Sequence, residues 1–285
     1  MSVQTGDTAI AATDDVSEDR SRAQKIAAER RRRQLLLNIG IRLVSLTIVL
    51  LLWEWLGNNI DPALFTKPSL IAVAAVDMIS SGELWQYLAP SLLVLAIGLT
   101  LACIVGIALG LLLARFWVVD VAFGVYITFL YSLPSVALVP LIVMWTGYET
   151  KAKVVILFMF AFFPMVINTY QGVKNVDPKL VEVGRSFRCS ERQLWANIVL
   201  PGALPFIVTG LRLAVGRGLI GMVLGDLYTA ISGIGYLIVR TASTYQVNKM
   251  FVPIVTLGLL GVTLTALLRF LEIHVAPWTK AADHD

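Results

Sequence analysis

The chain has 285 residues, 57% of them hydrophobic and 15% charged, and its mean hydropathy is +0.77. Soluble domains carry about 25% charged and about 45–50% apolar residues, so this composition excludes an ordinary soluble domain. The formal net charge of +4 comes from Lys and Arg near the ends of long apolar runs, which indicates orientation in a membrane rather than nucleic-acid binding. We therefore expect an all-α membrane protein.

The chain begins with a polar segment, residues 1–34, in which acidic residues are followed by the basic cluster Arg30–Arg33. This segment lacks the periodicity that would bury a helical face, so we predict a polar cytoplasmic tail. A cleaved signal peptide is not expected, because the polar stretch is long and no small-residue cleavage site follows the apolar run.

Six apolar runs then predict transmembrane helices in a domain of residues 35–275, followed by a C-terminal tail of residues 276–285. The predicted spans are residues 35–56, 91–114, 118–145, 154–170, 203–227 and 252–273. The third run is too long for one straight crossing and contains Pro134 and Pro140. Because proline removes a backbone donor and kinks a helix, we expect a break near Ser132–Pro134.

Six spans place both termini on the same side of the membrane. Lys and Arg in the segments on that side, chiefly residues 1–34 and 171–197, outnumber those in the other segments. The positive-inside rule therefore predicts a multi-pass protein of the bacterial cytoplasmic membrane with both termini in the cytoplasm.

The loop of residues 171–201, between the fourth and fifth spans, carries the most informative pattern. Asp177 followed by Pro178 predicts a helix start, with an N-cap acceptor and proline at the first helical position. Three apolar residues of this helix share one face at spacings of three and four. They are Leu180, Val183 and Phe187.

A second helix start follows directly in the same loop. Ser190 with Gln193 three residues later predicts a capping box. Leu194 and Ile198 face the same way from this helix, which we expect to end at Leu200–Pro201, where the chain reaches the membrane. The loop is thus predicted to form two short helices around a tight turn.

Two helices joined by a turn also occur in DNA-binding proteins. We exclude that function here, because spans on both sides tether the loop and no soluble dimeric domain is present. A structured loop without any partner remains an alternative. The exposed apolar face favours docking of a cytoplasmic protein.

The loop resembles the signature loop of the membrane subunits of bacterial ABC importers. That pattern is Glu-Ala-Ala, three residues, Gly, nine residues, Ile, any residue and Leu-Pro. The matching residues have the same spacing: Glu182, Val183, Gly184, Ile198, Leu200 and Pro201. Other segments resemble the nitrate/sulfonate/taurine-type permeases of the binding-protein-dependent type I importers: the stretch from Tyr131–Pro134 through Asn168, then Val176–Pro178, Gly210–Arg212 and Gly233–Ile238. The resemblance covers residues 35–275.

Three positions depart from the family pattern. Val183 and Gly184 replace the two alanines, and Asp226 stands at the end of the fifth span where such permeases often carry glutamate. Arg188 occupies the position of the turn glycine, where a left-handed backbone costs another residue about 1 kcal/mol. Either the turn is built differently, or Arg188 accepts this cost and presents its charge to a partner.

The resemblance implies the partners of the chain. Two permease copies would enclose the path, two cytoplasmic ATPases would each bind one of these loops, and an external binding protein would deliver the solute. The chain lacks a G-x-x-x-x-G-K-[ST] phosphate loop, so we expect ATP to be hydrolysed on a separate subunit and no enzymatic activity in this one. No cofactor is expected, and no metal site is proposed, because His274 has no second histidine near it. The residues expected to couple to the ATPase are Glu182, Val183, Gly184, Phe187, Arg188, Cys189, Ser190, Leu194, Ile198, Leu200 and Pro201.

Candidate residues for the translocation path lie within the spans. A charge inside the membrane is a functional candidate, and Arg217 could attract an anion or pair with Asp226, Asp120 or Glu54. Polar side chains at the predicted break and in the fourth span could line the same path. These are Tyr131, Ser132, Ser135 and Asn168. Glycines at four-residue spacing indicate close helix packing or a subunit interface: Gly106, Gly110, Gly221 and Gly225.

The favoured function is the permease subunit of an ATP-driven importer for a small solute. An organic anion or oxo-anion, such as a sulfonate, taurine or nitrate, is expected as the solute. A secondary transporter or channel that works without ATPase subunits is the main alternative. A membrane-embedded enzyme is a third possibility, but it requires clustered carboxylates or histidines, and the chain has only His274 and His284.

Overall fold

The structure is a computed structural model that describes residues 33–34, 36–61 and 64–275. Most of the two predicted tails, residues 1–32 and 276–285, lies outside these residues. Every regular element among the described residues is a helix, and the expected all-α membrane fold is confirmed. Five helices are long and apolar enough to cross a membrane, and one bent pair brings the number of possible spans to six in this part of the chain.

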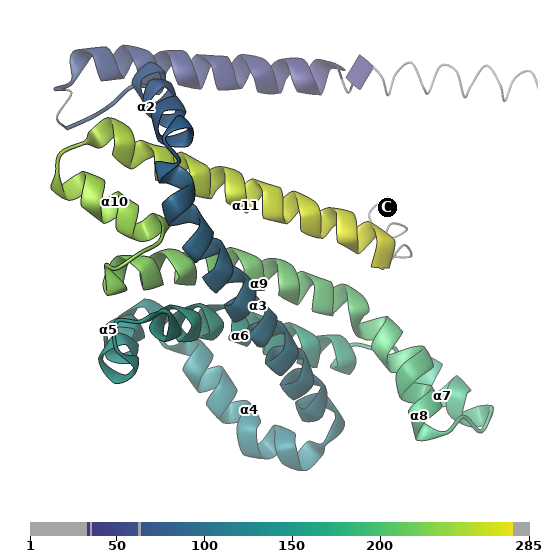
Figure 1. The fold of residues 1–285 in the computed structure, drawn as a ribbon. Coiled ribbons are helices and arrows are strands. Elements are labelled where there is room, and N and C mark those ends of the chain that lie inside the picture. The colour runs from purple at the N-terminus through teal and green to yellow at the C-terminus, as the bar shows by residue number, and fades with distance from the viewer. Residues whose placement is uncertain (1–32, 35, 62–63, 276–285) are drawn as a thin grey trace, which may run out of the picture. The chain divides into compact units, whose positions relative to one another are not determined.

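The chain divides into two units, residues 1–61 and residues 62–285. The first unit contains one apolar helix, Leu36–Asn59, which includes most of the first predicted span. The second unit contains all the other described helices (Figure 1). They are α2 (Pro68–Ser80), α3 (Glu83–Arg115), α4 (Trp117–Ser132), α5 (Ser135–Thr146), α6 (Thr150–Lys174), α7 (Pro178–Ser186), α8 (Glu191–Leu194), the π-helix η1 (Trp195–Val199), α9 (Leu200–Thr229), α10 (Ile234–Ser243) and α11 (Val247–Val275).

Helices α3, α6, α9 and α11 all extend beyond the predicted spans. Helix α3 begins at Glu83 rather than at residue 91, because Pro90 is accommodated inside the helix. Helix α6 extends to Lys174, so the first residues of the predicted loop 171–201 are still helical. Hydropathy alone underestimates such helices, because their polar end turns continue the backbone hydrogen bonds beyond the apolar run.

The predicted break in the third span is confirmed. Helices α4 and α5 meet at Leu133–Pro134 with a bend of 100°. Leu133 is extended, with φ −69° and ψ 141°, as expected for a residue that precedes proline. Pro140 does not interrupt α5, which runs to Thr146.

Helix α6 forms the centre of the second unit, and its most extensive contacts are with α3 and α9. Glycines bring these helices together. A Cβ atom added at Gly106 of α3 would lie 2.6 Å from the Met165 Cβ, and one at Gly221 of α9 would lie 3.0 Å from the Leu157 Cα. The predicted glycine pairs therefore pack against α6 of the same chain rather than forming a subunit interface.

One continuous helical segment joins the two ends of this unit. Helices α7 and α8 lie at one end, and α5 and α10 lie at the opposite end (Figure 1). The segment Glu191–Thr229 comprises α8, η1 and α9 and has 39 residues. The prediction that Leu200–Pro201 ends the loop helix is therefore wrong. In η1 the Leu200 N–H bonds to the Trp195 carbonyl five residues back, and this wider turn accommodates Pro201 without ending the helix.

Candidate functional site

The first helix of the loop begins as its sequence predicts. The Asp177 side chain accepts a hydrogen bond from the Lys179 N–H at 2.9 Å, and Pro178 occupies the first helical position of α7. The acceptor compensates one of the free N–H groups at the helix start. The predicted N-cap is thus confirmed.

The turn after α7 retains the geometry of a glycine turn although Arg188 occupies it. Arg188 is left-handed, with φ +55°. Its N–H bonds to the Arg185 carbonyl at 2.8 Å, and the Cys189 N–H bonds to the Gly184 carbonyl at 3.1 Å. This hydrogen-bond pair is the Schellman motif, which usually has glycine at the left-handed residue. Of the two alternatives left by the sequence, the second holds: the turn keeps its usual geometry and Arg188 accepts the backbone strain. The Arg188 side chain is exposed.

The second helix start is also confirmed. The Ser190 N–H donates to the Gln193 Oε1 at 2.8 Å, and the Gln193 N–H donates to the Ser190 Oγ at 3.4 Å. These reciprocal bonds form the predicted capping box. Local sequence therefore fixes both helix starts around the turn.

Gly184 sets how closely α7 packs on the second helix. A Cβ atom at this position would lie 2.6 Å from the Leu194 Cδ2 and 2.8 Å from the Ile198 Cδ1. Leu194 itself is buried. The small residue at this position therefore lets the two helices form one compact unit.

The face of α7 next to Gly184 also presents apolar side chains to the outside. Leu180, Val183 and Phe187 are 55%, 52% and 80% exposed. They border an open groove of about 530 Å³ that is also lined by Gly184, Cys189, Asn197, Ile198, Pro201 and Gly202. We call these three side chains and this groove the loop face. The Glu182 side chain is exposed on the same helix.

Two of the predicted path residues are brought together. The Arg217 guanidinium carbon lies 4.9 Å from the centroid of the Tyr131 ring, within the range of a cation–π contact. Both side chains are exposed. The Tyr131 ring also lies 6.3 Å from the ring of Phe163. This cluster places a cation beside the break between α4 and α5.

The remaining candidates contribute less to this cluster. The Asn168 amide donates to the Pro164 carbonyl of its own helix at 2.8 Å. Ser132 likewise bonds to the Thr128 carbonyl within α4 at 2.9 Å, and Ser135 is the first residue of α5. No described contact joins these three side chains to Arg217.

The proposed pairing of Arg217 with Asp226 or Asp120 is wrong. Asp120 accepts a hydrogen bond from the Tyr170 hydroxyl at 2.8 Å and lies 3.6 Å from the Lys174 ammonium group. Asp226 forms an ion pair with Lys153. Both carboxylates therefore already have other partners.

Sequence reasoning missed the ion pair between Lys153 and Asp226. The predicted spans 118–145 and 154–170 leave Lys153 in the loop between them, whereas this residue lies in the first turn of α6 and is 2% exposed. Its Nζ lies 2.8 Å from the Asp226 Oδ1, 2.5 Å from the Ser232 carbonyl and 3.0 Å from the Ser232 Oγ. These three acceptors match the three protons of the ammonium group.

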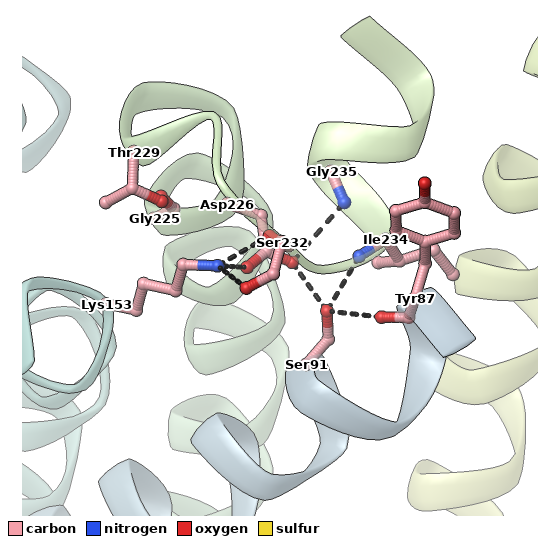
Figure 2. A network of polar contacts seen from close by, with 9 residues as sticks. All are labelled: Tyr87, Ser91, Lys153, Gly225, Asp226, Thr229, Ser232, Ile234 and Gly235. Carbon is pink, nitrogen blue, oxygen red and sulfur yellow. Dashed lines mark hydrogen bonds and ion pairs between the residues drawn. The ribbon is translucent and has the colours of Figure 1, made fainter. Parts of the chain in front are cut away.

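The second carboxylate oxygen of Asp226 is bonded as well (Figure 2). Its Oδ2 accepts from the Ser91 hydroxyl at 2.6 Å and from the Gly235 N–H at 3.3 Å. The Ser91 Oγ in turn accepts from the Ile234 N–H at 2.8 Å. The carboxylate thus accepts a hydrogen bond from a free N–H group at the start of α10 and places a negative charge there. The N-cap residue of α10 provides no side-chain hydrogen bond of its own. We call Ser91, Lys153, Asp226, Ser232, Ile234 and Gly235 the polar network.

Glycine is needed where α10 meets this carboxylate. Gly233 has φ +98°, and a Cβ atom there would lie 2.2 Å from both carboxylate oxygens of Asp226. At Gly235 an added Cβ would lie 2.7 Å from the Asp226 Cβ. The segment Gly233–Ile234–Gly235, noted above only as a family resemblance, therefore has a structural explanation.

Neither region has the composition of a metal centre. Within residues 33–34, 36–61 and 64–275, no group of three or more His, Cys, Asp or Glu side chains could hold a metal ion. The loop face is largely apolar, and the polar network is already hydrogen-bonded throughout. The loop face can therefore serve as a protein-binding surface, and the polar network can hold helices together.

Comparison with known proteins defines the class of protein. Residues 106–280 match the family model described as "Binding-protein-dependent transport system inner membrane component". The chain belongs to this family, that of the type I ABC importer permeases, and is a multi-pass inner-membrane transport subunit.

Individual relatives match over most of their length. ThiX of Halalkalibacterium halodurans, a formylaminopyrimidine transport permease protein, is 33% identical over 82% of this chain and 93% of its own. SsuC of Bacillus subtilis, a permease protein named for aliphatic sulfonates transport, is 30% identical over 82% of this chain and 86% of its own. The inward-facing MetNI methionine ABC transporter has a similar fold, with a TM-score of 0.56 at 17% identity, over 68% of this chain and 94% of that one.

Proposed function

We propose that this permease couples transport to a cytoplasmic ATPase through the loop face. The observation that carries the proposal is the exposure of Leu180, Val183 and Phe187 on a short helix whose start and turn are fixed by local hydrogen bonds. Exposed apolar patches rimmed by polar residues mark protein-binding sites, and an amphipathic helix binds a groove through residues at this spacing. Glu182 and Arg188 would supply charges at the rim.

The family membership supports the remaining partners. An importer of this class works with an ATPase and an external substrate-binding protein. We propose two ATPase subunits, two copies of this chain and one binding protein, with both termini and the loop face in the cytoplasm. Basic residues near the loop face, such as Lys179 and Arg185, support this orientation under the positive-inside rule.

The solute is proposed to be a small organic anion or oxo-anion. SsuC and the taurine permease protein TauC of Escherichia coli are relatives whose names refer to sulfonate compounds. The exposed Arg217 supports an anion, because a charge within a membrane span faces protein or a water-filled path rather than lipid. Its contact with Tyr131 holds the guanidinium group in place while its charge remains available.

Co-purification tests the docking proposal. The tagged chain would be expressed with its candidate ATPase as wild type, as Glu182→Lys, and as Glu149→Lys, a matched control at an exposed glutamate next to the start of α6. We expect a stable complex for the wild type and for Glu149→Lys, and its loss for Glu182→Lys at an unchanged melting temperature. Retention of the ATPase by Glu182→Lys, or equal loss in both variants, would contradict docking at this surface.

A further inference from the structure

The segment Glu191–Thr229 connects the loop face with the polar network. Its first turn follows the capping box at Ser190, and its last turn contains Asp226. The end of α9 lies at the opposite end of the second unit from α7 and α8 (Figure 1). At 1.5 Å per residue, its 39 residues span about 58 Å. A displacement of α8 therefore reaches Asp226 along one helix without passing through a flexible loop.

At that far end, the polar network joins four segments. Ser91 comes from α3, Lys153 from α6 and Asp226 from α9, while Ser232 and Gly235 come from the turn before α10 and from its first residues (Figure 2). The side chains of Lys153 and Asp226 are 3% and 0% exposed. These contacts are therefore shielded from competing water.

Stability alone does not account for a charged pair at this place. The desolvation penalty of two buried charges offsets much of their attraction, and well-packed apolar residues of similar size are often as stabilising. Apolar contacts, however, do not require one particular relative orientation of the segments. Each donor and acceptor of the network is satisfied in one arrangement of the four segments only, because hydrogen bonds require a defined distance and angle.

The other end of α10 is also tied to α3. Arg240 donates a hydrogen bond to the Tyr87 hydroxyl, and its Nη1 lies 3.8 Å from the Glu83 Oε1. Helix α10 is thus held at its first turn by the polar network and in its last turn by α3. Any movement of α9 and α3 carries α10 with it.

We infer that Lys153, Asp226 and Ser91 are positioning residues for transport. They fix α10 on the end of α9, so that movement of the loop face on the cytoplasmic side displaces α10 at the opposite mouth of the path. The transmission of ATP-driven movement rests on the proposed function. The rigid attachment of α10 does not.

The test separates attachment from fold stability. The double variant Lys153→Met/Asp226→Leu replaces the pair by apolar residues. Ser91→Ala removes the link from Asp226 to the Ile234 N–H, together with the 3.4 Å bond from the Ser91 hydroxyl to the Tyr87 carbonyl within α3. Lys151→Met is the matched control, because this exposed lysine lies two residues from Lys153 on the same helix. Each variant would be studied as the full chain, alone in lipid nanodiscs and in the complete transporter with ATPase and binding protein.

Two readouts are compared with the melting temperature. In nanodiscs, spin labels at Ser243 of α10 and Thr150 of α6, in a background with Cys103 and Cys189 replaced by serine, report their distance distribution. In proteoliposomes, the ratio of ATP hydrolysed to solute imported reports coupling. We expect both network variants to broaden the distance distribution. The ratio of ATP hydrolysed to solute imported should rise at least tenfold in the double variant and about threefold in Ser91→Ala, because coupling is weakened. Lys151→Met should equal the wild type.

A narrow distance distribution in Ser91→Ala or in a folded double variant would overturn the inference. So would a coupling ratio equal to that of the wild type in either protein. The spin-label readout requires no ATPase. Broadened distances in a chain whose wild type shows no ATP-driven import would therefore sustain the attachment of α10 while rejecting the proposed function.

Discussion

The loop face and the polar network lie at opposite ends of the same helical segment and are built in opposite ways. The loop face leaves Leu180, Val183 and Phe187 exposed, and its shape comes from contacts between residues close in sequence. The network buries Lys153 and Asp226 and joins residues up to 143 positions apart. The first region needs a partner to bury its apolar side chains, whereas the second is complete within the chain.

Positive φ angles illustrate the same difference. Arg188, with φ +55°, occupies the turn beside the loop face, and its side chain extends to the outside. Gly233, with φ +98°, lies beside the network, and any Cβ there would collide with Asp226. Backbone strain of about 1 kcal/mol is tolerated at the exposed turn, whereas the buried turn adds a steric clash that cannot be relieved by moving into solvent.

The largest effect is expected when one charge of the network is removed. Lys153→Met leaves the Asp226 carboxylate buried without its cation, which should reduce the free energy of unfolding by about 3–5 kcal/mol. Thermal unfolding in detergent micelles measures this loss. Lys151→Met, at a lysine whose side chain is 84% exposed, should have no measurable effect. Equal melting temperatures for Lys153→Met and Lys151→Met would show that the buried ion pair does not stabilise the chain, and would contradict the difference described between the polar network and the loop face.

A somewhat smaller loss is expected at the turn beside the network. Gly233→Ala places a Cβ 2.2 Å from the Asp226 carboxylate at a positive φ, and should destabilise the chain by about 2–3 kcal/mol. Gly216→Ala is the control, because a Cβ there meets no atom within 4 Å and alanine favours the helix. The comparison uses the same thermal unfolding assay. A Gly233→Ala protein as stable as Gly216→Ala would show that the turn can relax.

Between the two ends, Arg217 should affect transport but not stability. Arg217→Gln removes an exposed charge, and we expect import of an anionic solute to fall about tenfold, equivalent to about 1.4 kcal/mol, at an unchanged melting temperature. Arg217→Lys retains the charge and should keep more of the activity. Uptake of radiolabelled solute into proteoliposomes measures both. Equal uptake by Arg217→Gln and wild type would show that Arg217 does not contribute to the translocation path.

The smallest effect is a gain at the loop turn. Arg188→Gly removes the left-handed strain and should stabilise the α7–α8 turn by about 1 kcal/mol. Hydrogen exchange of the backbone amides in residues 178–194 should slow accordingly. Arg188→Ala is the control, since alanine pays the same backbone strain as arginine. Slower exchange in both variants would show that the arginine side chain, and not its backbone, determines the stability of the turn.

Local signals predicted the features that depend on neighbouring residues. The N-cap at Asp177, the capping box at Ser190 and the break before Pro134 each follow from a few adjacent residues, and each is confirmed. The all-α membrane fold followed from the length of the apolar runs. Sequence pattern was sufficient in these cases because the physical cause is itself local.

Features that depend on distant residues were missed. Lys153 and Asp226 are 73 positions apart, and nothing in either local sequence indicates the other as a partner. Asp226 was considered instead as a partner for Arg217, which lies on the same helix. The passage of the helix through Pro201 was also missed, because proline normally interrupts a helix and the π-helical turn that accommodates it has no clear sequence signal.

The central claim, ATP-driven import through this subunit, is tested most directly by solute uptake into proteoliposomes. The vesicles would contain the chain with its candidate ATPase, and the external binding protein and a sulfonate such as taurine would be added outside. We predict uptake that requires ATP inside the vesicles, the ATPase and the binding protein together. Uptake by the chain alone, driven by an ion gradient and indifferent to ATP, would contradict the account.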